Sequence, residues 1–229
     1  MERVAADRSA PMTAKGGSLP RRLVVCGTDT DVGKTVVSAW LVQGLQAHYW
    51  KPVQSGLRDG SDSQSLQHWL SLPPERLLPE AYRLQQPVSP HWAAEQDGVT
   101  LRAECLELPA GTKPLVVETA GGLMVPLRRD WLQIEVLQQW QLPIVLVARS
   151  GLGTLNHTLL SLEALQRRQL PVLGLVLNGP PHQDNPRTLK QLSGVPVLAE
   201  LPTMPRVNAE LLAQQWERQK MARHWPPLA

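Results

Sequence analysis

The stretch Gly27-Thr-Asp-Thr-Asp-Val-Gly-Lys-Thr35 decides the fold of this chain of 229 residues. It follows the apolar run Leu23–Cys26 and leads into the helix-like segment Val36–Gln46. A strand, a glycine-containing loop and a helix in this order direct backbone N–H groups and a helix N-terminus at one anion. Lys34 adds a positive charge for the β- and γ-phosphates, and the Thr35 hydroxyl can ligate Mg²⁺. The sequence therefore predicts a nucleoside triphosphate site.

The loop departs from the general pattern in the position of its first glycine. Four residues normally separate that glycine from Gly-Lys-Ser/Thr, whereas Gly27 stands one residue earlier and Thr28 takes its place. The alternative is a chance Gly-Lys-Thr in a turn. We favour the phosphate loop, because the flanking strand and helix patterns are the context that the motif requires.

The composition is typical of a single α/β domain. Hydrophobic residues make up 42% of the chain, which is enough for a substantial core. The formal net charge of +3 arises within the first 22 residues, where five basic residues stand against two acidic ones. We interpret residues 1–21 as a flexible basic tail, since they are rich in Ala, Ser, Gly and Pro, and residues 22–229 as a single domain. The balanced remainder argues against a nucleic-acid partner.

The cysteine count and the hydropathy pattern point to the cytoplasm. Cys26 and Cys105 form neither a disulfide framework nor a metal-binding spacing. No run is long and apolar enough to cross a membrane, and the first 22 residues lack the apolar stretch of a secretory signal. We therefore expect a cytoplasmic protein without a membrane partner.

Apolar runs rich in β-branched residues alternate with helical patterns along the chain. This alternation predicts a doubly wound, mostly parallel sheet with helices on both faces, similar to the P-loop NTPases. The expected strands are Leu23–Cys26, Tyr49–Val53, Leu115–Val117, Ile144–Val147, Val172–Leu177 and Val195–Leu198. The expected helices are Val36–Gln46, Asp62–Leu70, Trp131–Trp140, Leu155–Arg168 and Pro186–Leu192. Residues 57–110 show no clear strand, and beyond their one helix we interpret them as a long excursion serving a substrate or a dimer.

Polar or glycine-rich turns follow five of these strands. Because ligands of such sheets bind at the carboxyl ends of the strands, the five turns predict one common site. The turns are Gly27–Thr35, Gln54–Gly56, Glu118–Gly122, Arg149–Gly153 and Asn178–Pro181.

Three charged residues in or near these turns are candidates for the chemistry. Mg²⁺ needs oxygen ligands beyond the loop threonine; Glu118 is either such a ligand or a surface or helix-capping acid. Asp62 either ligates the metal or caps the helix that it begins. Lys51 either faces an anion at the sheet edge or extends to water. No nucleophile stands out, which favours phosphoryl transfer by positioning and charge.

Taken together, these segments resemble the dethiobiotin synthetases, ATP-dependent enzymes of biotin synthesis. The resemblance covers residues 23–205, and the early Gly27 is normal in that family. The segments that carry it are Gly27–Thr35, Lys51–Gly56, Ser61-Asp62, Pro87–His91, Glu118–Gly122, Asn156-His157 and Asn178. The resemblance implies a homodimer that uses ATP and Mg²⁺ to join CO₂ to 7,8-diaminononanoate (7,8-diaminopelargonic acid), giving dethiobiotin, ADP and phosphate.

The resemblance also implies roles for individual residues. Lys51 is the expected catalytic residue, and the expected metal ligands are Thr35, Asp62 and Glu118. The expected ATP-binding residues are Asp31, Val32, Gly33, Lys34, Thr35, Val36, Asp62, Glu118, Thr119, Ala120, Gly121, Asn178, Gly179, Pro202, Thr203 and Met204. The expected substrate-binding residues are Ser55 and, reaching the substrate carboxylate across the dimer, Gly153, Thr154, Leu155 and Asn156. For Asn156 a helix N-cap is the alternative.

Two departures from the family pattern affect these assignments. Thr119 replaces the usual glycine, and it would be strained if that position required a positive φ. The segment between Gly56 and Asp62 is short, so Asp59 is a rival to Asp62.

Two other functions remain as alternatives. The first is a nucleotide switch of the partitioning-ATPase type, but such proteins carry an extra lysine where this chain has Asp29, and they lack a segment like Pro87–His91. The second is a cobyrinate-type amide ligase, which would add a glutaminase domain for which this length leaves no room.

Overall fold

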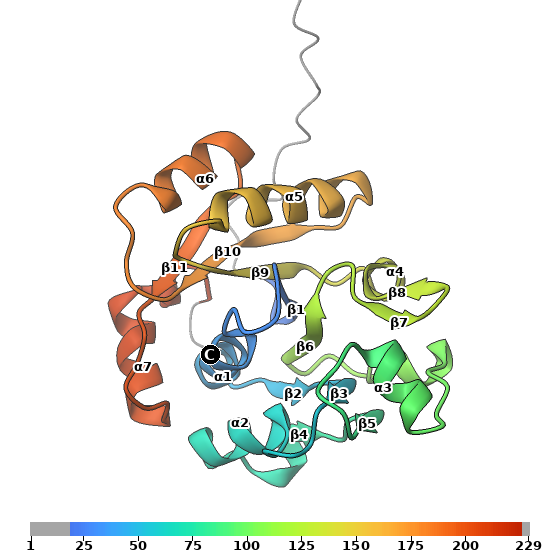
Figure 1. Ribbon diagram of the computed structural model, residues 1–229. Helices are drawn as coiled ribbons and strands as arrows, with labels where there is room; N and C mark the ends of the chain where they lie inside the picture. The colour runs from blue at the N-terminus through green and yellow to red at the C-terminus, as the bar shows by residue number, and fades with distance from the viewer. Residues whose placement is uncertain (1–18, 226–229) are drawn as a thin grey trace, which may run out of the picture.

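A computed structural model of the chain describes residues 19–225 and has a seven-stranded sheet at its centre (Figure 1). The strand order is β11-β10-β9-β1-β6-β2-β4, and every neighbouring pair is parallel. The strands are β1 (Arg22–Gly27), β2 (His48–Trp50), β4 (Leu77–Leu78), β6 (Leu115–Gly122), β9 (Ile144–Arg149), β10 (Val172–Asn178) and β11 (Val197–Leu201). The predicted α/β class is confirmed. The predicted basic tail over residues 1–21 falls almost wholly outside the described residues and stays a prediction.

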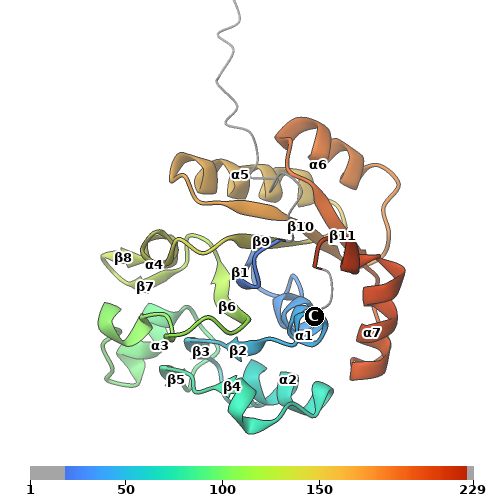
Figure 2. The ribbon, with the colours of Figure 1, turned by 180° about the vertical axis from the view of Figure 1, so that it is seen from behind.

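Helices cover both faces of the sheet, as Figures 1 and 2 show from opposite sides. One face carries α1 (Lys34–Leu45), α2 (Asp62–Leu70) and α7 (Ala209–Arg218). The other carries α4 (Gln133–Trp140), α5 (Thr154–Arg167) and α6 (Asn185–Ser193). The bounds predicted for α2 are confirmed, whereas α4 begins two residues later than predicted. Trp131 and Leu132 instead form β8 (Trp131–Leu132), which pairs with β7 (Pro126–Arg128) in a short antiparallel ladder.

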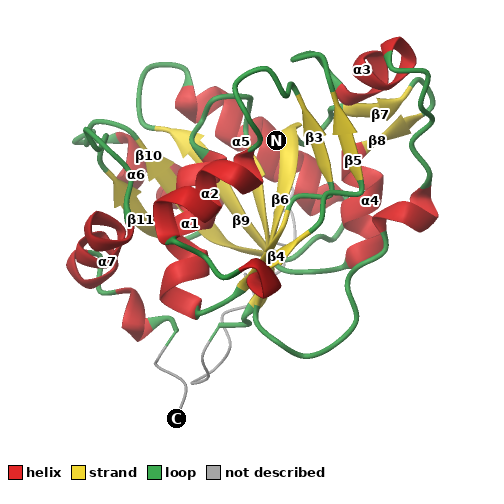
Figure 3. Ribbon diagram, turned by 90° about the horizontal axis from the view of Figure 1, so that it is seen from below, coloured by secondary structure: helices red, strands yellow, loops and turns green. Residues whose placement is uncertain are grey.

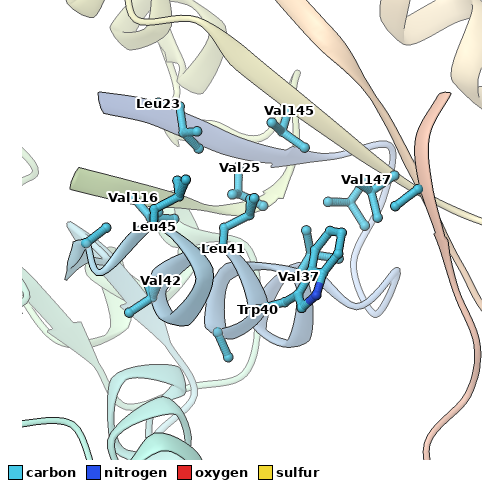
Figure 4. Packing of buried hydrophobic residues seen from close by; sticks show 14 of the residues in the cluster. Leu23, Val25, Val37, Trp40, Leu41, Val42, Leu45, Val116, Val145 and Val147 are labelled. Atoms are coloured by element: carbon cyan, nitrogen blue, oxygen red, sulfur yellow. The ribbon is translucent and has the colours of Figure 1, made fainter. Parts of the chain in front are cut away.

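The helix after the phosphate loop is anchored in the largest core cluster. Leu41 and Leu45 of α1 pack among Leu23, Val25 and Val116 from the central strands (Figure 4). These strand residues are buried to 1% exposure or less, because both faces of a parallel sheet are covered. The start of α1, which carries the loop lysine, is therefore fixed relative to β1 and β6.

The strand predicted over Tyr49–Val53 is wrong, because the structure divides it in two. β2 ends at Trp50, and β3 (Val53–Ser55) pairs with β5 (Tyr82–Leu84) in a separate two-stranded sheet (Figure 3). Pro52 explains the break: it has no N–H to donate, so it cannot continue a strand that has neighbours on both sides. Lys51 consequently lies at the end of the central sheet, where the chain changes direction.

The excursion over residues 57–110 also contains short strands, contrary to the prediction. It holds β4, β5 and the helix α3 (Pro90–Gln96), together with the 3₁₀ turns η1 (Pro74–Arg76) and η2 (Ala103–Leu106). Two- and three-residue strands leave too short an alternation to read from sequence. A third core cluster, which includes Val53, Leu84 and Leu127, fixes this region against β7 and α4.

The two described ends of the chain lie together. The Leu19 N–H donates to the His224 carbonyl at 2.9 Å, and the Trp225 indole donates to the Pro20 carbonyl at 3.0 Å. Trp225 follows the last short turn, η3 (Met221–Arg223). This junction lies at the amino end of β1. Between residues 19 and 225 there is no helix of the length and apolarity needed to span a membrane.

Candidate active site

The phosphate loop has the backbone geometry that its glycines predict. Gly33 adopts φ +92° immediately before α1, and Asp31 adopts φ 56°. Gly27 leaves no room for a side chain, since a Cβ there would come within 2.7 Å of the Asp29 carbonyl oxygen. The early glycine that departs from the general pattern is therefore required by the tight path of the loop.

The loop lysine is buried, and it contacts the loop backbone. Lys34 is 6% exposed, and its Nζ donates to the Asp29 carbonyl at 2.9 Å. Burial lowers the pKa of Lys34 below its usual value, and Glu118 offsets part of that effect. A bound anion would stabilise the charged form of this buried ammonium, which has lost its contacts with water.

A buried carboxylate lies beneath the loop. Glu118, on β6, has no exposed surface. Its Oε1 accepts hydrogen bonds from Thr35 Oγ1 at 2.9 Å and from Lys51 Nζ at 3.0 Å. Its Oε2 accepts one from the Tyr49 hydroxyl at 3.0 Å. The interpretation of Glu118 as a surface or helix-capping acid is wrong, because three side chains, from α1, β2 and the turn after β2, converge on a carboxylate that solvent does not reach.

Lys51 is the cation of this cluster. It is 4% exposed and forms ion pairs with both Glu118 and Asp62. Burial alone would lower its pKa, but the two carboxylates raise the pKa of Lys51 above its usual value, so it stays charged. The alternative that its side chain extends to water is wrong. Burial and the neighbouring Glu118 raise the pKa of Tyr49 well above the ordinary range, so its hydroxyl stays protonated.

Asp62 reaches this cluster from the start of α2 without capping that helix. The cap is Ser61, whose hydroxyl accepts from the Gln64 N–H at 3.3 Å, while the Gln64 side chain accepts from the Ser61 N–H at 2.8 Å. This reciprocal capping box frees the Asp62 carboxylate to face Lys51. The rival Asp59 is exposed and does not line the cavity beside the loop.

The donors around Lys51 suit Mg²⁺. One hydroxyl from Thr35 and two carboxylates from Asp62 and Glu118 are the hard oxygen ligands that this ion prefers. In the structure the two carboxylates contact the Lys51 ammonium and the Thr35 hydroxyl donates to Glu118, so the position already favours positive charge. The set contains only two carboxylates, and nowhere in residues 19–225 could a group of three or more His, Cys, Asp or Glu side chains hold a metal ion.

Thr119 is accommodated without strain. It does not adopt a positive φ, and its hydroxyl donates to the Val25 carbonyl at 3.3 Å. The positive φ of this loop, +59°, falls at Gly121. Gln133 holds the same loop from α4: it accepts from the Ala120 N–H at 3.0 Å and donates to the Gly122 carbonyl at 2.8 Å. The condition under which Thr119 would be strained, a positive φ, is therefore not met.

A cavity of about 720 Å³ joins these groups to the excursion. On the loop side it is lined by Lys34 and Thr35, and on the sheet side by Lys51 and Asp62. Its far wall includes Ser55, whose Oγ is buried and has no hydrogen-bond partner within the described residues. A polar atom left in this state indicates a place for a ligand group. The remaining lining residues are Thr30, Asp31, Gly33, Val36, Gln54, Trp69, Pro87, Val88, Ser89, Pro90, Ala120, Gly121 and Val125.

Several predicted site residues lie outside this cavity. Asn178 touches the loop from β10: its amide donates to the Val32 carbonyl at 3.2 Å and lies directly over Gly33. Gly179 follows it, and residues 202–204 follow the neighbouring β11. At the start of α5 the N-cap is Gly153, not Asn156, which is exposed. None of residues 153–156 lines the cavity of their own chain.

A second cavity of about 460 Å³ lies between the phosphate loop and α5. It shares Thr30, Ser89 and Val125 with the first cavity, so the two are adjacent. Its wall combines polar and apolar side chains, and it includes Met124 and Leu160, which are 50% and 57% exposed.

Sequence reasoning missed the groups that orient the site residues. Tyr49 stands two residues before Lys51, a spacing that places both on one face of an extended chain, and this was the available signal. Gln133 and Gln54 gave no such signal; Gln54 accepts from the Asp62 N–H at 3.1 Å and donates to the Gly56 carbonyl at 3.3 Å. Arg149, at the end of β9, forms an ion pair with Asp29 of the loop at 3.2 Å.

Comparison with known protein families and relatives gives one consistent result. A family model described as an AAA domain matches residues 21–211. The chain is 50% identical to the ATP-dependent dethiobiotin synthetase BioD of Rhodopseudomonas palustris strain HaA2, over 85% of this chain and 91% of the relative. It is 47% identical to the protein of the same name from Brucella ovis, over 86% of this chain and 93% of the relative.

Solved structures with low sequence identity share the fold. The septum site-determining protein MinD of Pyrococcus horikoshii matches with a TM-score of 0.61 and 15% identity, covering 90% of this chain and 97% of that one. A ParA family ATPase of Chlorobium tepidum matches with a TM-score of 0.53 and 11% identity, covering 91% and 93%. These similarities place the chain among folds of the P-loop NTPase type.

Proposed function

Because the chain belongs to the family of ATP-dependent dethiobiotin synthetases, we propose that its reaction takes place in the cavity beside the phosphate loop. The chain is an ATP-dependent ligase of biotin biosynthesis, and it forms dethiobiotin from 7,8-diaminononanoate and CO₂. The nucleotide-switch alternative is not favoured, since the chain is 50% identical to a synthetase but only 15% identical to MinD and 11% identical to the ParA family ATPase.

One observation carries the assignment of the cavity. Lys34, Lys51 and Ser55 reach the same space from the loop, the sheet edge and the separate small sheet. The two ammonium groups suit the phosphates and an anionic substrate group, while the unpartnered Ser55 hydroxyl suits an amine. Phosphoryl transfer needs this kind of positioning and charge rather than a protein nucleophile.

The proposed chemistry has three steps. A substrate amine adds to CO₂ and loses a proton, giving a carbamate. A carbamate oxygen then attacks the γ-phosphorus of ATP; the bond to the bridging oxygen breaks, and ADP leaves. Finally the second amine attacks the carbamate carbon, loses a proton and expels phosphate, which closes the cyclic urea. Lys51 neutralises the carbamate and Lys34 the phosphates, so that two anions can approach in line.

We also propose that Thr35, Asp62 and Glu118 hold Mg²⁺. Bound there, the ion would neutralise charge on the phosphate oxygens. Two of them, Asp62 and Glu118, already share one cation, Lys51, and Thr35 donates to Glu118. When Mg²⁺–ATP arrives, the ammonium of Lys51 is free to turn toward the cavity that it lines.

Two further predicted groups fit this proposal at its borders. Asn178, Gly179 and residues 202–204 follow β10 and β11 beside the loop, which suits the adenine end of the nucleotide. Among the residues implied in contact with the substrate carboxylate, Gly153 and Asn156 are exposed, as is the preceding Leu152, whereas Thr154 is buried. Their position supports a homodimer in which each chain completes its partner's site.

A cytoplasmic location is part of the same proposal. ATP is available there, and a reducing compartment keeps thiols free. The buried Cys26 and the exposed Cys105 are free in this structure. Burial raises the pKa of Cys26 to about 12, so its thiol stays protonated and unreactive in a reducing or an oxidising compartment.

A single assay tests the function. Protein is incubated with ATP, Mg²⁺, bicarbonate and the diamine, and the product is detected by mass. We expect a product heavier than the diamine by CO₂ less water, with one ADP released per product. ADP release that ignores the diamine, without such a product, would contradict the assignment and favour the nucleotide switch.

A further inference from the structure

We propose that Tyr49 is a positioning residue that restricts Glu118 to a single metal-facing oxygen and thereby favours Mg²⁺ over Ca²⁺. This inference rests on the proposed metal site of Thr35, Asp62 and Glu118. It concerns a residue that touches neither nucleotide nor substrate in the proposed arrangement, and it follows from how the two oxygens of Glu118 are divided.

The division is visible in the hydrogen bonds. Glu118 Oε1 faces Thr35 Oγ1 at 2.9 Å and Lys51 Nζ at 3.0 Å, which is the side of the loop and the cavity. Glu118 Oε2 faces the Tyr49 hydroxyl at 3.0 Å on the opposite side. The Tyr49 hydroxyl therefore donates to Oε2, while Oε1 is the oxygen that faces Thr35 and Lys51.

The backbone fixes this contact. β2 and β6 are neighbouring parallel strands, with Tyr49 in register with Val116. Glu118 stands two residues further along β6, on the same face of the sheet as Val116. The Tyr49 side chain reaches it diagonally across the ladder. Both residues are fully buried, and the Tyr49 ring lies in the same core cluster as Leu66 of α2.

A fixed donor on Oε2 has a consequence for metal choice. A carboxylate with two free oxygens can bind a cation through both, which Ca²⁺ accepts, whereas Mg²⁺ demands near-octahedral geometry and short single contacts. By holding Oε2, Tyr49 leaves Glu118 a monodentate ligand whose orientation is set before the metal arrives. Partners that orient a ligand in this way typically change metal affinity by about 10–100-fold when they are removed.

The chain offers a matched control for this hydroxyl. It contains two tyrosines, Tyr49 and Tyr82. The Tyr82 hydroxyl accepts from the Arg102 N–H at 2.9 Å and does not line either cavity. Tyr49→Phe and Tyr82→Phe thus remove the same atom, one at the proposed metal site and one away from it, while both keep the ring.

The experiment measures binding of a non-hydrolysable ATP analogue by calorimetry, titrated separately with Mg²⁺ and with Ca²⁺. We expect Tyr49→Phe to need about tenfold more Mg²⁺ than wild type, with a smaller change for Ca²⁺. Its Mg²⁺/Ca²⁺ preference therefore falls, and analogue binding without metal stays unchanged. Tyr82→Phe should match wild type. An unchanged metal preference, or an equal loss for both ions, would overturn the role of Tyr49.

Two further measurements separate this inference from its premise. If Glu118→Gln leaves the Mg²⁺ dependence unchanged, the metal site itself is wrong, whereas a sensitive Glu118 with an unaffected Tyr49→Phe refutes only the role of Tyr49. Fluorotyrosine incorporated into the Tyr82→Phe chain gives one ¹⁹F signal, from Tyr49 in an otherwise native core. That signal should shift on adding Mg²⁺ with the analogue; no shift would count against the inference even if Tyr49→Phe fails to fold.

Discussion

Lys34 and Lys51 line one cavity but are stabilised in opposite ways. Lys51 lies between two carboxylates, and its pKa is raised despite burial, whereas Lys34 contacts a backbone carbonyl and its pKa is lowered by burial. Removing a buried cation that is paired with carboxylates leaves those carboxylates unpaired and destabilises the fold. Removing a buried cation that has no carboxylate partner does not, and such a cation is available to bind an anionic ligand. The two lysines should therefore respond differently to removal.

For Lys34→Met we expect a large loss of activity without a loss of stability. Product formation should fall on the order of 10²-fold or more, as when a preorganised charge at a transition state is removed. Because folding lowers the pKa of Lys34, its charge opposes folding at neutral pH, and this penalty fades only as pH rises toward the ordinary lysine pKa. The melting temperature at pH 7 should stay equal or rise; a fall, with the exposed Lys190→Met unchanged, would contradict this account.

For Lys51→Gln we expect a loss of activity together with a loss of stability in the metal-free protein. Glu118 is left buried without its cation, and breaking such a pair costs about 3–5 kcal/mol. Mg²⁺ should therefore raise the melting temperature of this variant more than that of wild type. The variant should bind Mg²⁺–ATP within about tenfold of wild type, or roughly 1.4 kcal/mol, and make almost no dethiobiotin. An equal response of both proteins to Mg²⁺ would show that the ion does not replace the ammonium.

The choice between Asp62 and Asp59 is tested by a matched pair of amides. Asp62→Asn removes a charge that contacts Lys51, whereas Asp59→Asn changes an exposed side chain outside the cavity. We expect about tenfold more Mg²⁺ to be required by Asp62→Asn, with Asp59→Asn close to wild type. The Mg²⁺ concentration for half-maximal activity is the measurement, and sensitivity at Asp59 instead would mean that the loop is misassigned.

At the scale of elements, the position of the phosphate loop depends on how α1 is held. α1 packs between the sheet and α7, and its Trp40 ring lies 5.3 Å from that of Trp216 on α7. The closest point is Gly44, where an added Cβ would come within 2.2 Å of the Trp216 ring. Any separation of α7 from α1 here would be transmitted along the helix toward its first residue, Lys34.

Gly44→Ala should therefore destabilise the protein, although alanine is the better helix former. Helix propensity favours alanine by about 1 kcal/mol, but overpacking against Trp216 costs about 1–3 kcal/mol or more. We expect a net fall in the free energy of unfolding, measured by urea at an unchanged m-value. Gly151→Ala is the control, since its Cβ would have no atom within 4 Å and its φ is not positive. Stabilisation by Gly44→Ala would mean that the two helices are not in firm contact.

The sequence predicted the parts of the fold that local patterns encode. Long apolar runs such as Ile144–Val147 marked the central strands, and the loop before Lys34 marked the nucleotide edge, because periodicity and glycine placement are local signals. The predicted strand Tyr49–Val53 ran through Pro52 because apolar residues lie on both sides of that proline, although proline itself is a signal for a break. The partners Tyr49 and Gln133 could not be assigned, because their roles depend on contacts made across the sheet.

At the scale of the whole molecule, apolar side chains are exposed at the start of α5 and along it, and no contact within the described part of the chain covers them. Leu152 is fully exposed beside Gly153, and Leu160 lies half exposed on the same helix. Where such side chains form one contiguous patch, they mark a surface that another molecule covers. The proposed homodimer would bury them and bring residues 153–156 to the partner's substrate.

Mixed dimers test this arrangement. Lys51→Ala and Asn156→Ala should each be inactive alone, but a hybrid dimer would contain one site with both residues intact. We expect activity to return when the two variants are mixed after partial unfolding. If subunits pair at random, half of the dimers are hybrids, and each hybrid has one intact site of two. The restored activity is then at most about one quarter of wild type. If hybrid dimers form, as judged by mass, and no activity returns, each site lies within one chain.

The contact between Leu19 and His224 means that the chain can be circularly permuted without changing the active site. The ends meet at the amino edge of β1, while the nucleotide edge lies at the other end of the same strand. A short peptide could join them, and the polypeptide could be reopened in an exposed turn such as residues 110–113 without moving a catalytic group. For the same reason, an enzyme tethered to a surface through Trp225 would present its substrate entrance to the solution.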